Sequence, residues 1–277
     1  MISRILRVGV VASAALMIGS VATATTLNLT TSGSFGTLDG ALFVQGPTQS
    51  GTGVFPAFVQ VAGNNEIKSA YNTGVNGTLD NGSSPTFNHA IRLSDVSTVT
   101  LGSTSFYVFA LDINENNNAA NDQYLSLDDI IVATGTVENP NTTNPLLLGT
   151  VRYNLSDGNV IGLNYALQPG SGEGDMFMLI PTANFAGALQ TDFVYLYSKF
   201  GALGLNPSGL PAGIYSNSDG FEEWALLPVQ PQITNFCTTN PGDPTCQQIP
   251  EVPEPATLVM LGTGLAALAV GMRKLRA

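Results

Sequence analysis

The chain has 277 residues, of which 44% are hydrophobic and only 10% are charged, whereas about a quarter of the residues are charged in an average soluble domain. This deficit favours an exported, loop-rich protein over a cytosolic enzyme. Between residues 25 and 250 only four basic residues stand against 18 acidic ones, a net charge of −14, which excludes nucleic-acid binding through a basic patch.

The first 24 residues have the three-part layout of a secretory signal peptide. Arg4 and Arg7 supply the positive start, Val8–Val21 forms the apolar run, and Ala22-Thr23-Ala24 is a small-residue cleavage site. We expect the mature chain to begin at Thr25. An uncleaved N-terminal anchor is the less favoured alternative, because the apolar run is short and ends in small residues.

Residues 25–227 predict one sizeable domain made of short strands. Short apolar runs are bounded by Gly, Asn, Pro and Asp, and only Thr182–Gln190 suggests a short helix. The candidate strands are Thr26–Leu29, Ala41–Gln45, Ala57–Val61, Asn88–Leu93, Ser97–Leu101, Ser105–Ile113, Leu125–Ala133, Leu147–Asn154, Val160–Ala166, Asp175–Ile180, Asp192–Ser198 and Glu222–Leu227. Regular spacing with turn signals between the strands predicts an all-β fold, an antiparallel β-sandwich that may take the jelly-roll form.

The strongest chemical candidate is the polar segment that follows the strand ending near Asp112. Asp112, Asn114 and Asn116 alternate along it and Asp122 lies nearby, so their oxygens could surround a hard cation such as calcium. The segment fails the EF-hand pattern, since the sixth position is Asn117 and not Gly. The alternative is a solvated, Asx-rich hairpin loop, and no other cofactor is expected.

Catalytic motifs are weak along the whole chain, and we predict no catalytic residue. His89 is the only histidine, and no nucleophile motif accompanies it. Paired carboxylates for glycoside hydrolysis need only proximity in space, and the sequence singles out no pair. Further carboxylates near the polar segment could come from Asp219, Glu222 and Glu223, or from Glu173 with Asp175. Trp224 could belong to a sugar-stacking platform, although such aromatics are more often core residues.

Residues 228–251 form a proline-rich linker that we expect to be a semi-extended stalk. Cys237 and Cys246 lie within it, on either side of a turn-rich segment. Two cysteines this close in an exported chain predict a local disulfide. Metal binding by the pair is poorly supported, because a site needs three or four ligands.

The last segment, residues 252–277, combines a short motif, an apolar run and a basic end. Pro253-Glu254-Pro255 comes first, Ala256–Met272 carries no charge, and Arg273, Lys274 and Arg276 follow. As a helix the apolar run spans roughly 25 Å, which is barely enough to cross a bilayer as a single C-terminal transmembrane helix. The trailing cations predict a cytoplasmic C-terminal end, with the domain on the other side of the membrane.

This three-part order resembles the PEP-CTERM sorting signal of Gram-negative bacteria. Such tails are also called an ice-binding protein C-terminal domain, a label that describes the tail and does not predict ice binding. The resemblance implies transient residence in the inner membrane, processing by the membrane transpeptidase exosortase, and passage to the cell surface or the extracellular matrix. Two prolines around Glu254 keep this stretch extended and open to an enzyme cleft.

The sequence therefore predicts a non-enzymatic surface or matrix protein that is associated with extracellular polysaccharide, as in a biofilm. Two alternatives of other classes stay open. One is a secreted carbohydrate-active enzyme, and the other is a calcium-dependent carbohydrate-binding module.

Overall fold

The structure, a computed structural model, describes residues 24–49, 55–62, 67–116, 122–155, 158–170, 172–229 and 231–247. Nearly all of the predicted signal peptide, the Pro253-Glu254-Pro255 motif and the predicted transmembrane helix lie outside these ranges. Within them, no helix has the length and apolar character needed to cross a membrane.

The described strands form two sheets. In sheet A the order is β1 (Thr26–Asn28), β11 (Val160–Asn164), β9 (Tyr124–Gly135), β13 (Phe193–Phe200) and β5 (Lys68–Tyr71), with β10 (Thr150–Asn154) beside β9 and β6 (Ile91–Arg92) beside β13. In sheet B the order is β2 (Phe35–Leu38), β3 (Ala41–Gln49), β12 (Glu173–Pro181), β8 (Thr104–Asp112), β14 (Glu222–Ala225) and β4 (Ala57–Val61), with β7 (Thr98–Leu101) beside β8.

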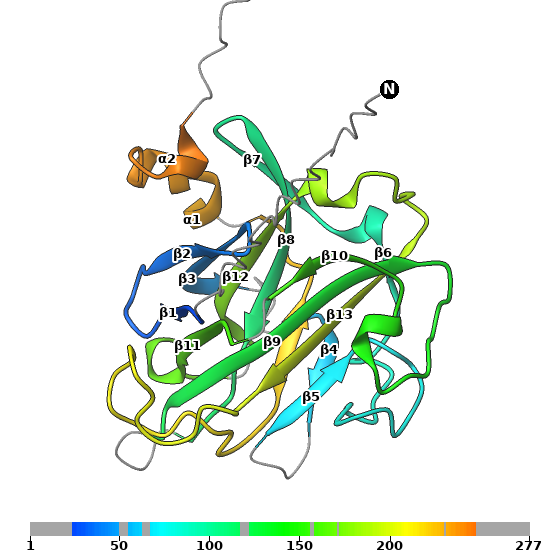
Figure 1. Ribbon diagram of the computed structural model, residues 1–277, viewed down its shortest axis with the longest axis horizontal. Coiled ribbons are helices and arrows are strands. Elements are labelled where there is room, and N and C mark those ends of the chain that lie inside the picture. Colours follow the sequence, from blue (N-terminus) through cyan, green and yellow to red (C-terminus); the bar gives the residue numbers. More distant parts are fainter. Residues whose placement is uncertain are drawn as a thin grey trace, which may run out of the picture.

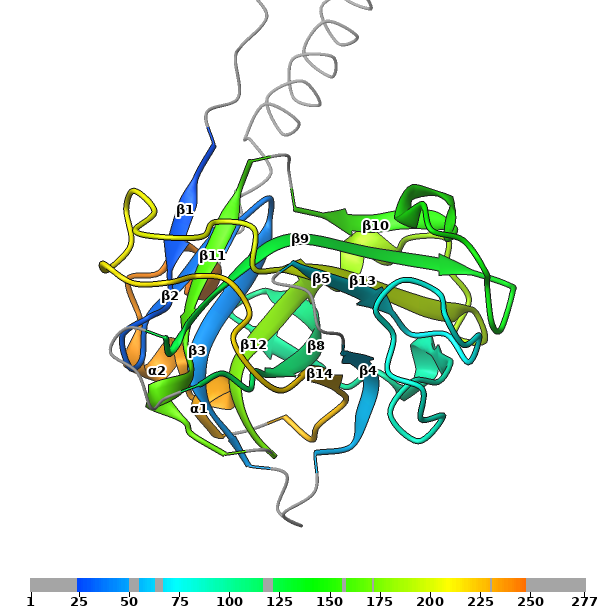
Figure 2. The ribbon, with the colours of Figure 1, turned by 90° about the horizontal axis from the view of Figure 1, so that it is seen from below.

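The two sheets lie face to face, and Figure 2 shows them as two layers. Among the described strands, only β1 and β11 pair in parallel, and the other pairings are antiparallel. The prediction of a mostly antiparallel, two-sheet β fold is thus confirmed, whereas the jelly-roll form stays a prediction. All twelve candidate segments overlap a strand, and Thr182–Phe185 forms a short 3₁₀ helix.

Alternation along the strands builds a core between the sheets. On β8, Tyr107, Phe109 and Leu111 point into this core, and they meet residues of β9 and β13. The intervening residues of β8 belong to a second apolar cluster on the outer face of sheet B. Sheet B is therefore buried on both faces, which explains why β8 is continuously apolar rather than half polar.

The outer face of sheet B is covered by the segment that the sequence predicts to be a stalk. Residues 231–247, here called the cap, fold into α1 (Pro231–Thr234), α2 (Phe236–Thr239) and a 3₁₀ turn at Pro244–Cys246, and Figure 1 shows them beside β2, β3 and β7. Ile233 and Phe236 are almost fully buried in the outer cluster.

The cap corrects the prediction of an extended linker for residues 231–247. Pro231 and Pro244 each stand at the first residue of a helical turn, where proline is tolerated because no helical N–H is needed there. Two apolar side chains three positions apart then face sheet B together. The ring of Phe236 packs edge-on against Phe35 of β2, with 5.0 Å between the ring centroids.

Candidate functional site

Cys237 and Cys246 form a disulfide within the cap. Their sulfur atoms are 2.10 Å apart and their Cα atoms 5.1 Å apart, and both residues pack against the outer cluster. The bond closes the cap on itself and does not tie it to a sheet. The contact between the cap and sheet B therefore rests on Ile233, Phe236 and the close approach of Gly102, whose added Cβ would lie 2.8 Å from the Thr245 carbonyl oxygen.

The feature that departs most from an ordinary β fold is a group of buried acidic side chains around one end of β14, here called the carboxyl cluster. Each is at most 4% exposed, although carboxylates are rarely buried unless they are paired. The members are Asp112, Glu115, Asp175, Glu222 and Glu223.

The register of β14 divides this cluster between the two faces of sheet B. Trp224 belongs to the core between the sheets and Ala225 to the outer cluster, so alternation sends Glu222 inward and Glu223 outward. Asp112 pairs with Glu223 across the antiparallel ladder, and directly opposed residues share a face. Asp112 and Glu223 therefore lie on the outer face.

On the outer face, hydrogen bonds from backbone and amide groups hold the carboxyls. Asp112 Oδ2 accepts from the Gly172 backbone N–H at 2.7 Å, and Asp175 Oδ2 accepts from the Ile113 N–H at 2.9 Å. Gln60 Nε2 donates to Glu223 Oε1 at 2.9 Å. Burial raises the pKa of Asp175 well above its usual value, and the nearby Asp112 raises it further.

On the inner face, Glu222 meets Glu115, which follows β8, and Lys68 of β5. Both side-chain oxygens of Glu222 are buried and accept no hydrogen bond from an N–H or hydroxyl group of the described residues, and the same holds for Glu115 Oε1. The two carboxyls lie close enough to shift each other's pKa. Because two carboxylates are acceptors only, neither can satisfy the other unless one of them carries a proton.

Burial dominates the protonation of this inner pair. It raises the pKa of Glu115 to about 7, against the opposing effects of two Ser218 hydrogen bonds and Lys68. The pKa of Glu222 rises well above its usual value, first through burial, with Lys68 lowering it and Glu115 raising it. One cation faces two carboxyls, so a proton completes the local charge balance.

The four residues of the predicted calcium site are held by three different parts of the chain. Asp112 is held on the outer face by Gly172, while Asn114 Nδ2 donates to the Phe221 carbonyl at 3.0 Å. The Asn116 N–H and the Asp122 carbonyl both contact the Ser218 hydroxyl, at 3.0 and 3.4 Å. Within the described ranges, no group of three or more His, Cys, Asp and Glu side chains is arranged to hold a metal ion. The calcium site stays a prediction.

Trp224 is a core residue and not part of a sugar-stacking platform. It is fully buried, and its indole N–H donates to the Ser198 hydroxyl at 3.0 Å. His89 is exposed and is held through its backbone N–H, which donates to the Phe58 carbonyl at 3.2 Å.

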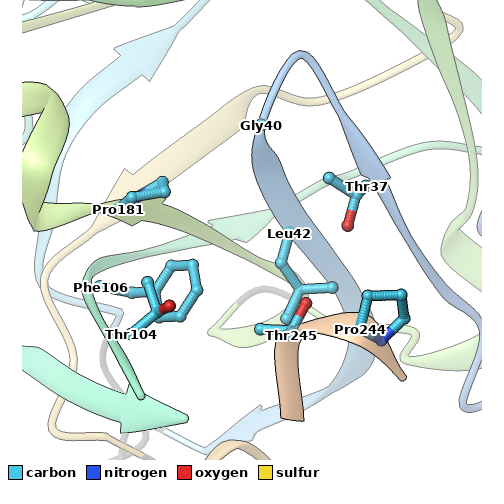
Figure 3. A pocket seen from close by; sticks show the side chains of 8 residues that line it. All are labelled: Thr37, Gly40, Leu42, Thr104, Phe106, Pro181, Pro244 and Thr245. Atoms are coloured by element: carbon cyan, nitrogen blue, oxygen red, sulfur yellow. The ribbon is translucent and has the colours of Figure 1, made fainter. Parts of the chain in front are cut away.

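A pocket of about 490 Å³ lies where the cap meets sheet B. Its lining residues are Thr37, Gly40, Leu42, Thr104, Phe106, Pro181, Pro244 and Thr245, and Figure 3 shows them around the opening. The lining offers three hydroxyl groups and no ionisable side chain, so it lacks the groups needed for acid–base chemistry.

Sequence reasoning missed Lys68 and Glu115. Lys68 lies in β5, which no apolar run predicts because the strand reads Lys-Ser-Ala-Tyr. The one signal in the sequence is that Lys68 is one of only four basic residues between positions 25 and 250. Glu115 stood inside the polar segment, yet its burial depends on Ser218, more than 100 residues away in sequence.

Comparison with protein families finds the PEP-CTERM protein-sorting motif at residues 251–275. No curated protein and no solved structure matches the chain. The motif begins four positions after Gln247, the last described residue of the cap. It implies recognition by exosortase, and with it export to the cell surface or the extracellular space. The chain therefore carries a PEP-CTERM protein-sorting motif at residues 251–275.

Proposed function

We propose that this protein is a non-enzymatic component of the cell surface or extracellular matrix, held there in association with extracellular polysaccharide. The observation that carries the proposal is the sorting motif at residues 251–275, which directly follows a β domain closed by its own disulfide-linked cap. A signal peptide at residues 1–24 would start the route, and the inner membrane would hold the chain until exosortase processes it.

The burial of the carboxyl cluster favours a binding or structural role over catalysis. A glycoside hydrolase presents its two carboxyl groups to a sugar in an open cleft. All five members of the carboxyl cluster are instead at most 4% exposed, and four of them accept hydrogen bonds from backbone N–H groups or from an amide. In this conformation, a polysaccharide does not reach them.

The surface of the domain suits a hydrated polysaccharide matrix. With 18 acidic and four basic residues between positions 25 and 250, the exported part resists self-association through net charge. Its many Asn, Thr, Ser and Gln side chains can donate to and accept from sugar hydroxyls. Calcium bound at the Asp112 segment would add a carbohydrate-binding mode, and that stays an alternative proposal.

Treatment of intact producing cells tests the proposal. Enzymatic removal of extracellular polysaccharide should release the protein into the medium, whereas treatment with a heat-inactivated enzyme should not. Retention on the cells after the polysaccharide is gone would contradict the association. Hydrolysis of the purified polysaccharide by the isolated exported protein would replace the proposal with the enzyme alternative, and glycan binding only with calcium would replace it with the calcium-dependent module.

A further inference from the structure

The pocket between the cap and sheet B is built from side chains that the strand register brings to one face. Thr37 of β2 lies directly opposite Leu42 of β3, and Pro181 of β12 lies directly opposite Phe106 of β8. Leu42 and Phe106 belong to the outer cluster, and directly opposed residues share a face. Four neighbouring strands of sheet B therefore supply one side of the pocket.

The cap supplies the other side of the pocket. Pro244 and Thr245 belong to its 3₁₀ turn, and Figure 3 shows them across the opening from Phe106. The Thr245 backbone N–H donates to Asp243 Oδ1 at 2.8 Å, and the next residue, Cys246, is part of the disulfide. A capping carboxylate and a covalent bond thus hold this turn, and the pocket is complete only while the cap is folded.

The lining combines hydroxyl groups with apolar surface. Within the described ranges, the hydroxyls of Thr37, Thr104 and Thr245 make no hydrogen bond, and each can both donate and accept. Leu42 and Phe106 supply apolar surface beside them. The volume of about 490 Å³ lies in the range of roughly 300–1,000 Å³ that is typical of small-molecule sites. A sugar ring complements such a lining, because it carries hydroxyls at its rim and C–H groups on its faces.

The charges around the pocket favour a neutral ligand. The lining has no ionisable side chain, and the acidic residues next to it in sequence, Asp39 and Asp243, already accept hydrogen bonds. Asp39 Oδ2 accepts from the Asn159 amide at 2.8 Å, and Asp243 holds the Thr245 N–H. No cation is offered to an acidic sugar, which the acidic excess of the exported part also repels.

We propose that this pocket binds a neutral sugar unit of the extracellular polysaccharide. The inference rests on the proposed function, because it names the place at which that association occurs. C–H groups of the sugar pack on Leu42 and Phe106, while its hydroxyls exchange hydrogen bonds with Thr37, Thr104 and Thr245. Because a polysaccharide repeats its units, weak binding at each pocket adds up when one chain meets several copies of the protein.

A wholly apolar ligand fits the same lining less well. Thr37 is exposed, and Thr104 and Thr245 are half-buried, so water can reach their hydroxyls in the free protein. An apolar ligand would cover these hydroxyls without offering a partner, which is unfavourable. A sugar replaces the water and keeps the hydrogen bonds.

Titration of the isolated exported protein with oligosaccharides tests the site. The probe is the neutral fraction released by mild acid from the polysaccharide of the producing cells, and the acidic fraction, separated by anion exchange, is the second arm. Threonine methyl NMR should show shifts at Thr37, Thr104 and Thr245 with the neutral fraction only. Thr104→Val should weaken binding roughly three- to tenfold. Thr98→Val, the same change at an exposed position of β7 outside the lining, should leave binding unchanged.

Unshifted signals at Thr37, Thr104 and Thr245 with the neutral fraction would overturn the site, as would equal weakening by Thr104→Val and Thr98→Val. Shifts at these residues with 1-decanol but with neither oligosaccharide fraction would identify an apolar ligand instead. Should Thr104→Val fail to fold, Thr37→Trp decides, because it fills the opening from an exposed position and should abolish the shifts at Thr104 and Thr245.

Failure of the site and failure of the proposed function give different results. If the protein leaves the cells with the polysaccharide while the pocket signals stay unshifted, the association stands and the site is wrong. If the neutral fraction shifts the pocket signals but the protein stays on cells stripped of polysaccharide, the association is wrong and sugar binding by the pocket stands.

Discussion

The indole N–H of Trp224 in sheet B donates to the hydroxyl of Ser198 in sheet A, at 3.0 Å and fully shielded from solvent. Ser198 is a polar residue on a strand whose neighbours Leu196 and Phe200 point into the same core. A buried indole N–H needs an acceptor, and Ser198 supplies one across the gap between the sheets. This bond joins β14 to the opposite sheet two residues from Glu222 of the carboxyl cluster.

Removal of that acceptor should destabilise the domain. Ser198→Ala leaves the Trp224 N–H buried and unpaired, which costs about 1–3 kcal/mol of unfolding free energy. Ser105→Ala is the matched control, because Ser105 bonds Thr100 at an exposed position of the neighbouring sheet. Urea unfolding should show a clear loss for Ser198→Ala and a small one for Ser105→Ala. Equal losses would contradict a special role of the buried bond.

The sequence could predict the parts of this architecture that depend on local pattern. Alternation in Ser105–Ile113 predicted β8, the central strand with both faces buried. Phe35–Leu38 and Lys68–Tyr71 escaped prediction, because each is four residues long and mixes polar or glycine residues with apolar ones. Such strands form because their neighbours in the sheet supply partners, which is information that lies elsewhere in the chain.

The carboxyl cluster could not be predicted for a related reason. Lys68 meets the carbonyl of Gly220, which is 152 residues away, and Glu115 meets Ser218 at a separation of 103. A single sequence carries no sign of such contacts. The cap could not be predicted for a different reason, since seven prolines from Pro228 to Pro255 indicate an extended segment, and Ile233 and Phe236 alone make too short an apolar pattern to predict helical turns.

Burial of Phe236 should make the cap a stable part of the domain. Phe236→Ala removes a ring that packs on Phe35 and should cost about 3–5 kcal/mol of the free energy that holds the cap in place. Thr238→Ala, an exposed change in the same helix, should have little effect. Hydrogen exchange of the cap amides measures the difference. Unchanged protection in Phe236→Ala would show that the cap does not depend on this contact.

The close approach between Gly102 and the cap predicts that alanine has different effects at Gly102 and at Gly40. Gly102 and Gly40 both lie in hairpin turns with positive φ, at +58° and +84°, so alanine strains the backbone at either site. At Gly102 the new Cβ would also meet the Thr245 carbonyl oxygen at 2.8 Å, whereas at Gly40 nothing lies within 4 Å. Gly102→Ala should therefore loosen the cap, as measured by faster reduction of the Cys237–Cys246 disulfide. Gly40→Ala should leave that reduction rate unchanged.

Stability should fall as the pH rises through the range in which the inner carboxyls lose their proton. The folded-state pKa of Glu115 is raised from 4.5 to about 7, so between these values the folded protein binds more protons than the unfolded chain. The free energy of unfolding then decreases with increasing pH, by up to about 1.4 kcal/mol per unit for one such group. Below pH 4.5 this contribution is fully present.

Urea unfolding at a series of pH values checks this dependence. Glu222→Gln should make the slope shallower without abolishing it, because one buried carboxyl no longer titrates while burial still raises the pKa of Glu115. A free energy of unfolding that rises over that interval in the unmodified protein would contradict the assignment of raised pKa values to the inner pair.

The sorting motif should determine where the protein accumulates. Replacement of Pro253, Glu254 and Pro255 by alanine removes the extended stretch that the prolines impose, while the described residues, the last of which is Gln247, are unchanged in sequence. The variant should therefore fold normally but remain in the inner-membrane fraction at its unprocessed mass. A matched variant with alanine at Pro241, which lies in the cap turn outside any helical segment, should be processed and reach the surface.

Surface appearance of the triple variant at the same rate as the unmodified protein would contradict exosortase recognition through this motif. Accumulation of both variants in the membrane would instead trace the defect to folding, which the protease resistance of the domain would reveal.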